Sequence, residues 1–295
     1  MARPARQIEL RGVFASAITP RHKNSQESDF SAALDLLDFL AAGGVQGICL
    51  LGATGEFLDY SFMDRQRLVY LGVKRSRVPI IAGVSHSTLA GSIELADEAI
   101  SSGADALILM PPWFYPYSQC EIEQFYREFA RETSDAVPIL LHNLPQCTSQ
   151  IEIETVRRLI DTGRFAGIKD SSGAWDYFSQ LLALKRERPF SLFGGADGLA
   201  AQALAEGADG IISASACAVP ELLVALARSG SAEHEGARLR EFVERVNRFP
   251  FPVAIKRAVE LRGQKAGPPL VPLSPENQRA LEEFSSWFKE WIRRA

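Results

Sequence analysis

The sequence lacks any apolar run long enough to cross a bilayer and any long basic cluster. Its longest apolar runs, such as Gly47–Gly52 and Ala106–Phe114, fall far short of the roughly 20 residues that a membrane helix needs. No Lys/Arg run exceeds the pair Arg293-Arg294, and 32 basic against 36 acidic residues give a formal net charge of −4. We therefore expect no membrane span and no nucleic-acid partner.

Cysteine is also scarce. The four cysteines are widely spaced and form no Cys-x-x-Cys pair, which argues against a zinc site or a disulfide scaffold. They are Cys49, Cys120, Cys147 and Cys217. The first seven residues include Arg3 and Arg6 but lead into no apolar segment, unlike a secretory signal. We expect reduced thiols, no metal site and a cytoplasmic location.

One unit recurs along the chain: a short apolar run, a Gly- or Ser-rich corner and a helical pattern of ten to sixteen residues. This alternation is typical of parallel βαβ units. Eight such units in about 230 residues favour an α/β fold of the (β/α)8 TIM-barrel type over a doubly wound sheet, which usually has fewer strands and a phosphate-binding fingerprint. The predicted strands are Gly12–Thr19, Gly47–Leu51, Pro79–Val84, Ala106–Met110, Pro138–His142, Ala166–Lys169, Ser191–Gly194 and Gly210–Ser213.

The alternation stops after Gly230, where three helical segments follow. These are Glu233–Asn247, Pro252–Arg262 and Pro275–Arg294. A proline-rich stretch separates the last two, and Ser274-Pro275 suits the N-cap and first position of the final helix. We predict a catalytic barrel over residues 1–230 and a C-terminal three-helix extension over residues 231–295.

Lys169 is the most informative polar residue, because it ends the apolar strand Phe165–Ile168. In a barrel of this type, reactive groups lie at the carboxyl ends of the strands. Burial disfavours the ammonium form, and a neutral amine can form a Schiff base with a 2-oxo acid. Pairing of Lys169 with Asp170 is the alternative interpretation, and spacing alone leaves both open.

His142 ends the neighbouring strand, after the apolar run Pro138–Leu141. Its side chain should therefore point into the barrel mouth near Lys169, where an imidazole could move protons at neutral pH. The other three histidines have no partner at metal-ligand spacing, so we expect peripheral roles for them. They are His22, His86 and His234.

Three strand-end loops are candidates for binding an anion. The loop Gly52–Glu56 offers successive backbone N–H groups and a Thr hydroxyl, which suit a carboxylate or a phosphate, although an ordinary tight turn has the same pattern. The loops after the seventh and eighth strands are where barrels often hold phosphate, and they do not decide between a sugar acid and a phosphorylated ligand. Their candidate residues are Gly195, Asp197 and Ser213.

In this order and spacing, the motifs resemble the dihydrodipicolinate synthase / N-acetylneuraminate lyase family of Schiff-base-forming lyases. The resemblance covers nearly the whole chain. Its carriers are Gly52–Glu56, Pro111–Pro116, His142–Pro145 with Thr148, Gly167–Ser172, Gly195–Asp197, Ala254–Lys256 and Pro269–Ser274.

The resemblance implies a (β/α)8 barrel with a C-terminal helical region, usually a homotetramer, with no metal or organic cofactor. It implies that Lys169 forms the covalent imine with pyruvate or another 2-oxo acid. It also implies that Ala53 and Thr54 hold the carboxylate through backbone N–H and hydroxyl groups, and that Ile212 offers a backbone contact to the ligand.

Several positions depart from the family pattern. The strand-5 Tyr that relays protons is replaced by His142, and the other two hydroxyl positions of the synthase relay correspond to Ala53 and to Phe114, the latter a subunit-interface candidate. The Arg that binds the synthase's second substrate is replaced by Cys147, and a neutral thiol cannot make a bidentate pair with a carboxylate. Gly198 stands where the lyase branch has an acidic residue. We expect neither dihydrodipicolinate synthesis nor sialic-acid cleavage.

The sequence thus favours an aldolase that releases or uses pyruvate, acting on a small 2-oxo acid such as a 2-keto-3-deoxy sugar acid. Lys169 would be the nucleophile, and His142 would replace the phenol as general acid and base, titrating near neutrality. A hydro-lyase that dehydrates a 3-deoxy-2-oxo sugar acid by the same imine chemistry is one alternative. A non-catalytic 2-oxo-acid-binding protein is another, since fold alone does not guarantee function.

Overall fold

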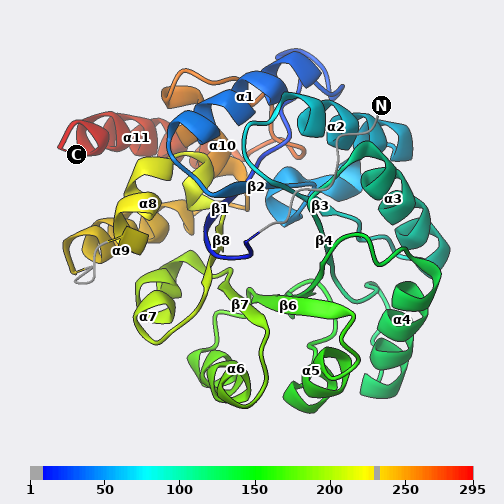
Figure 1. Ribbon diagram of the computed structural model, residues 1–295. Helices are drawn as coiled ribbons and strands as arrows, with labels where there is room; N and C mark the ends of the chain where they lie inside the picture. The colour runs from blue at the N-terminus through cyan, green and yellow to red at the C-terminus, as the bar shows by residue number, and fades with distance from the viewer. Residues whose placement is uncertain (1–8, 229–232, 295) are drawn as a thin grey trace.

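The computed structural model describes residues 9–228 and 233–294. Eight parallel strands close into a barrel in the order β1 to β8, with helices around it (Figure 1). The predicted (β/α)8 fold class is confirmed. The strands are β1 Gly12–Ser16, β2 Gly47–Leu50, β3 Ile80–Gly83, β4 Ala106–Leu109, β5 Ile139–Asn143, β6 Phe165–Asp170, β7 Ser191–Gly194 and β8 Gly210–Ser213.

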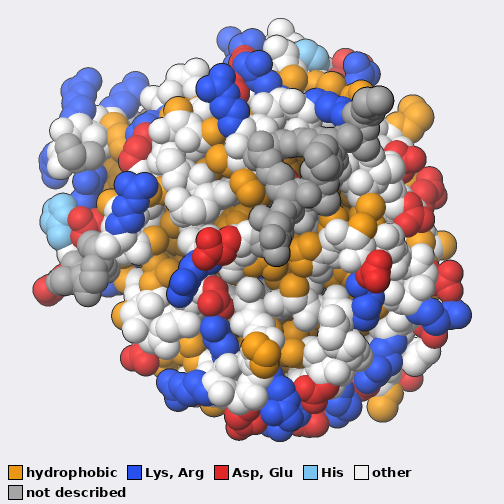
Figure 2. Space-filling view, in the orientation of Figure 1, with side chains coloured by type: hydrophobic (Ala, Val, Ile, Leu, Met, Phe, Trp, Pro, Cys, Tyr) orange, Lys and Arg blue, Asp and Glu red, His pale blue; other side chains and the backbone are white. Residues whose placement is uncertain are grey.

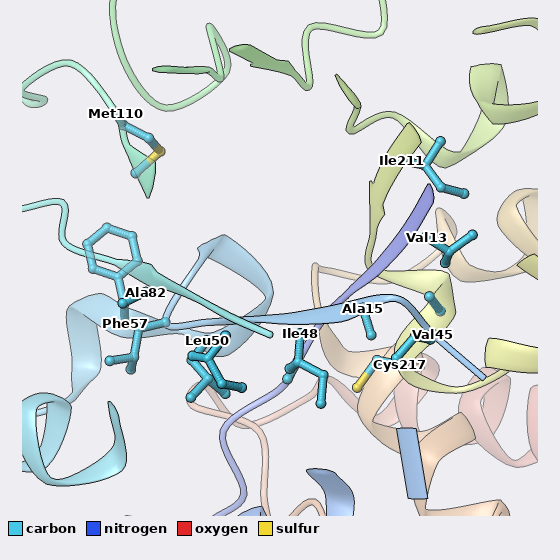
Figure 3. Close-up of a cluster of buried hydrophobic side chains, with 14 of the residues drawn as sticks. Val13, Ala15, Val45, Ile48, Leu50, Phe57, Ala82, Met110, Ile211 and Cys217 are labelled. Carbon is cyan, nitrogen blue, oxygen red and sulfur yellow. The ribbon is translucent and has the colours of Figure 1, made fainter. Parts of the chain in front are cut away.

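Successive side chains of each strand face opposite sides of the sheet, so the barrel has two apolar layers. The layer inside the barrel consists of Phe14, Cys49, Ile81, Ala106, Ile108, Leu140, Phe193 and Ile212. The rings of Phe14 and Phe193 meet edge to face there, with centroids 5.5 Å apart. The alternating residues, among them Val13, Ala15 and Ile48, belong to the larger cluster between sheet and helices (Figure 3).

The helices of the barrel begin and end where local sequence signals place them. Asp29 caps the first helix by accepting a hydrogen bond from Ala32 N at 2.9 Å, and Gly103 ends the third with a φ of +90°. Such caps satisfy backbone groups that the helix leaves unpaired. The helices are α1 Phe30–Ala42, α2 Phe62–Arg75, α3 Leu89–Ser102, α4 Gln119–Glu132, α5 Ile153–Ile160, α6 Trp175–Glu187, α7 Ala200–Ala205 and α8 Pro220–Arg228.

Three more helices follow the barrel, as expected: α9 Glu233–Val246, α10 Val253–Leu261 and α11 Pro275–Trp291. Ser274 caps α11 by accepting from Asn277 N at 3.2 Å, and residues 292–294 form a 3-10 turn instead of the predicted last turn of helix. α11 packs on α9 through a cluster of aromatic rings that includes Phe242 and Phe288. The predicted boundary at residue 230 lies outside the described residues, so the division into two domains stays a prediction.

The surface carries charges of both signs. Lys and Arg side chains are interspersed with Asp and Glu over the face shown in Figure 2. Within residues 9–228 and 233–294, no helix combines the length and apolarity that crossing a membrane requires.

Candidate active site

Lys169 and His142 lie side by side at the carboxyl ends of neighbouring strands. They are register partners in the β5–β6 pair. Leu140, two residues before His142, belongs to the interior cluster. Because side chains alternate between the two faces of a strand, His142 and its partner Lys169 also point toward the barrel interior. Both are buried, with exposed fractions of 5% for Lys169 and 3% for His142. The sequence-based pairing of these residues is confirmed.

The surroundings of Lys169 favour its neutral amine. Burial lowers the pKa of Lys169, and the nearby groups Cys49 and Asp197 oppose this shift by their charge. Asp170 is engaged elsewhere: its carboxylate accepts hydrogen bonds from Asn143 Nδ2 at 2.7 Å and from Ser172 Oγ at 2.8 Å. The side chain of Lys169 therefore faces the interior instead of turning outward to Asp170. A desolvated amine of this kind is a nucleophile toward carbonyl groups.

Gly195 makes room for the lysine. A Cβ at this position would lie 2.6 Å from Lys169 Cε and 2.2 Å from Ser171 Oγ. These distances are far below van der Waals contact, so any side chain at this position would displace the amine or the loop after β6. The Gly195 N–H also donates to the Asp170 carbonyl at 2.7 Å. The predicted candidate Gly195 thus lies against Lys169 and shapes the space around its amine.

His142 is held by a hydroxyl that the sequence did not single out. Its Nε2 lies 3.1 Å from Ser171 Oγ. Burial, and secondarily the charge of Lys169, lowers the pKa of His142 well below the ordinary value of 6.5. The imidazole is therefore neutral at physiological pH and can accept a proton. The sequence predicted that His142 titrates near neutrality, and the structure shifts this titration to more acidic pH.

The loop after β2 contains Ala53 and Thr54, the predicted carboxylate clamp. Ala53–Gly55 form a 3-10 turn in which the Gly55 N–H donates to the Gly52 carbonyl at 2.9 Å. In such a turn the N–H groups before Gly55, those of Ala53 and Thr54, have no partner within the turn itself. Thr54 Oγ1 lies 2.9 Å from Ser16 Oγ in a buried contact. The Thr54 hydroxyl donates to Ser16, so the donors that the turn leaves for an anion are the backbone N–H groups of Ala53 and Thr54.

A buried ion pair ties this loop to the C-terminal extension. Glu56, which has a φ of +51°, follows the turn, and its Oε2 lies 2.9 Å from Lys256 Nζ of α10. Lys256 also donates to the Pro268 carbonyl at 3.1 Å. The side chains are only 5% and 4% exposed, respectively. The sequence motifs contained both residues, but no signal within the sequence joined them.

The predicted residues at β7 and β8 have local partners. Asp197 Oδ2 accepts a hydrogen bond from Ser215 N at 2.7 Å, which links the two loops. Ser213 Oγ accepts from Ala216 N at 3.0 Å. Ile212 belongs to the interior cluster, so the side chain of Ser213 faces the other side of the strand. Direct ligand contact is therefore favoured for Ile212 backbone atoms over the Ser213 side chain.

Phe114 is the most exposed large hydrophobic residue of the described chain, at 84%, and has a φ of +81°. A non-glycine residue in this region stores backbone strain. Its ring packs edge to face on Tyr115, also exposed, with centroids 4.9 Å apart. An apolar protrusion of this kind fits the predicted interface role, which stays a prediction.

The remaining histidines lie away from Lys169 and His142. His22 Nδ1 lies 3.4 Å from Asp29 Oδ2, and His86 Nδ1 lies 2.9 Å from Thr88 Oγ1. Across the parts of the chain that the structure describes, no three His, Cys, Asp or Glu side chains are grouped as metal ligands would be.

A largely apolar pocket of about 250 Å³ opens beside the clamp. Its wall includes Ala53 after β2, Met110 after β4 and Leu144 after β5, which places it at the carboxyl-terminal mouth of the barrel. Phe251 and Leu270, from the segments before and after α10, complete the wall. The extension thus contributes directly to the site.

Comparison with known proteins agrees with this architecture. The sequence profile described as the dihydrodipicolinate synthetase family matches residues 9–290. The chain belongs to this family. A 4-hydroxy-tetrahydrodipicolinate synthase of Methanothrix thermoacetophila is 30% identical over 284 residues, covering 93% of this chain and 95% of the relative. An uncharacterized DapA-like lyase of Chloroflexus aurantiacus is 32% identical over 292 residues, covering 92% and 95%.

Solved structures of the family share the fold. The structure of YagE from E. coli K12, a prophage protein of the dihydrodipicolinic acid synthase family in complex with pyruvate, superposes with a TM-score of 0.88. It is 24% identical, and the match covers 96% of this chain and 98% of that one. The likeness establishes a common barrel for two family members whose sequences have diverged widely.

Proposed function

We propose that this protein is a Schiff-base-forming lyase that makes or breaks a carbon–carbon bond next to the carbonyl of a 2-oxo acid. The observation that carries the proposal is a buried Lys169 with a lowered pKa, beside a neutral His142 at the mouth of the barrel. The pyruvate in the related structure supports pyruvate as the small-molecule partner.

In the cleavage direction, the neutral amine of Lys169 adds to the C2 carbonyl of a 4-hydroxy-2-oxo acid, one proton is taken up and water leaves, which forms a protonated imine. The final hydrolysis returns this proton. A base then removes the proton of the C4 hydroxyl. The C3–C4 bond breaks, its electron pair moves toward the imine nitrogen, and C4 leaves as an aldehyde. The enamine takes up a proton at C3, and water hydrolyses the imine to release pyruvate and regenerate Lys169.

The other residues hold the substrate and move the protons. The N–H groups of Ala53 and Thr54 bind the carboxylate, which fixes C2 near Lys169. His142, neutral and held by Ser171, accepts the C4 hydroxyl proton and returns it in the condensation direction. The side chain of Lys169 supplies the covalent chemistry in this scheme, which involves no further cofactor.

Borohydride trapping tests the proposal directly. Incubating the full-length protein with pyruvate and borohydride should reduce the imine to a stable secondary amine on Lys169, located by peptide mass spectrometry. Protein treated with borohydride alone is the control. Failure to trap pyruvate or any other 2-oxo acid on Lys169 would overturn the lyase proposal in favour of a non-catalytic binding protein.

Replacing His142 by Phe should lower kcat by about 10²- to 10⁴-fold, because proton transfer is lost, while pyruvate trapping on Lys169 persists. Since burial holds the pKa of His142 well below 6.5, kcat of the wild type at saturating substrate should stay level from pH 8 to about 6.5. It should then fall at more acidic pH as the imidazole gains a proton.

The Phe variant should lack this acidic decline, and His142→Tyr, which restores a proton-carrying group, should recover part of the activity. An unchanged kcat and an unchanged acidic decline in His142→Phe would remove His142 from the mechanism.

Dehydration by the same imine is the second candidate, because loss of a C3 hydroxyl also uses the imine as an electron sink. Product analysis separates the two: cleavage yields pyruvate and an aldehyde, whereas dehydration keeps all carbons in one molecule. We do not propose dihydrodipicolinate synthesis, because Ala53, Phe114 and Cys147 lack the hydroxyl and guanidinium groups of the synthase pattern.

A homotetramer in the cytoplasm is part of the proposal, supported by the family resemblance.

A further inference from the structure

We infer that the aldehyde half of the substrate carries an apolar aromatic or branched aliphatic substituent, instead of a polyhydroxylated or carboxylated chain. The inference rests on the proposed function, since it concerns the group bonded to C4 of the 2-oxo acid. It is carried by the apolar pocket of about 250 Å³ beside the clamp.

The pocket adjoins the reacting groups. Leu109 and Leu141 are register partners at the end of the β4–β5 pair, and Met110 and His142 directly follow them in the chain. His142 is in turn the partner of Lys169. Met110 and Ala53 both line the pocket. A substrate held by the clamp and bonded to Lys169 would therefore extend into this space with the part beyond C3.

Three polar side chains of the pocket are paired or uncharged, which makes them poor partners for a second charged or hydroxylated group. The Glu56 carboxylate is paired with Lys256 at 2.9 Å, and Thr148 Oγ1 lies 3.2 Å from both the Leu144 and Ser149 carbonyl oxygens. Burial raises the pKa of Cys147, which keeps its thiol neutral.

Charge in the pocket also argues against an anionic substituent. Among the described residues that line the pocket, none is Lys, Arg or His. Asp59, exposed at the rim, adds a negative charge. A carboxylate on the aldehyde would have to lose its water without gaining a cation, and sugar hydroxyls would lose theirs for few new hydrogen bonds.

The walls suit an apolar group instead. The rings of Phe57 and Trp113 meet edge to face, with centroids 5.5 Å apart, and Figure 3 shows the Phe57 ring on the same side of the core as Met110. Leu58 and Phe251, exposed by 61% and 56%, continue the apolar surface outward. Because an apolar cavity of about 150 Å³ can hold benzene, a pocket of about 250 Å³ is large enough for a phenyl or branched alkyl group.

The test compares aldehydes as partners of pyruvate with the full-length protein. Benzaldehyde and 3-methylbutanal represent the apolar class, D-glyceraldehyde the polyhydroxylated class and succinic semialdehyde the anionic class. The products are 4-hydroxy-2-oxo acids, quantified by mass spectrometry. We expect kcat/KM for benzaldehyde to exceed the values for glyceraldehyde and succinic semialdehyde by about 10- to 100-fold. Equal or reversed preference would overturn the inference.

Variants of one wall residue sharpen the result. Leu270→Gln should lower kcat/KM for benzaldehyde by about 10-fold by placing an amide in the apolar wall, whereas Leu270→Met should retain most of it. Val271→Gln, at the 73% exposed neighbour outside the pocket, is the matched control and should behave as wild type. A Leu270→Gln variant that keeps its full benzaldehyde preference would contradict the assignment of this pocket.

The two proposals fail in distinguishable ways. Absence of a borohydride-trapped pyruvate adduct on Lys169 contradicts the lyase function itself. A normal pyruvate adduct together with a preference for glyceraldehyde or succinic semialdehyde leaves the lyase function intact and refutes only the apolar substrate class.

Discussion

Replacing Lys169 by Met should abolish turnover while leaving the protein as stable as the wild type or more stable. Loss of the nucleophile should lower kcat by about 10⁴-fold or more. Because burial of the amine is unfavourable and lowers its pKa, an apolar side chain of similar length should raise the free energy of unfolding by about 0.5–2 kcal/mol. Steady-state kinetics and urea denaturation measure the two effects.

The stability gain of Lys169→Met should depend on pH. The folded protein holds the proton of Lys169 less tightly than the unfolded chain does, so wild-type stability rises with pH between the lowered pKa and the ordinary lysine value. The difference between variant and wild type should therefore shrink as pH increases through that interval. Lys169→Arg is the control: it keeps a buried cation that cannot become neutral, and it should be both inactive and less stable. A Met variant that is strongly destabilised would contradict this account.

Replacing Lys256 by Met should destabilise the protein by about 3–5 kcal/mol, because it leaves the buried Glu56 carboxylate without its cation. The free energy of unfolding from denaturant titration measures this loss. The KM for pyruvate should also rise, since Glu56 directly follows Ala53 and Thr54, the proposed carboxylate clamp.

Two further variants separate the buried charge from a general effect on α10. The double variant Lys256→Met/Glu56→Gln removes the unpaired charge and should recover part of the lost stability. Arg257→Met, on the same helix, removes ion pairs that are partly exposed, so it should cost about 1 kcal/mol or less. If Lys256→Met and Arg257→Met lowered the free energy of unfolding equally, burial of the Glu56–Lys256 pair would not increase the cost of losing its cation.

The sequence predicted the parts of the site that depend on local patterns. Each strand is a short apolar run between turn residues, so its position in the chain is a local property, and a barrel places reactive groups at strand ends. The sequence alone therefore predicts that Lys169 and His142 lie on neighbouring strand ends. The ends of elements were less well predicted: the first strand stops at Ser16 instead of Thr19.

What the sequence did not predict depends on contacts between distant segments. Ser171 as the partner of His142, and Ser16 as the partner of Thr54, follow from the register of the β5–β6 and β1–β2 pairs, which the sequence does not specify. The apolar wall of the pocket could not be predicted from the sequence either, because Phe251 and Leu270 lie in the C-terminal segment that was expected to be separate from the barrel. Without them the substrate class could only be taken from resemblance, which suggested a sugar acid.

The Glu56–Lys256 pair also bears on when the site is completed during synthesis. The two residues are 200 positions apart in the chain, and ribosomes add about 5–20 residues per second, so about 10–40 s separate their translation. During that time the Glu56 carboxylate remains hydrated, because its buried position has no cation. A nascent chain that has already made its strands therefore lacks the ion pair that holds the proposed substrate-binding loop. On the proposed function, activity begins only when the last helices have been made and docked.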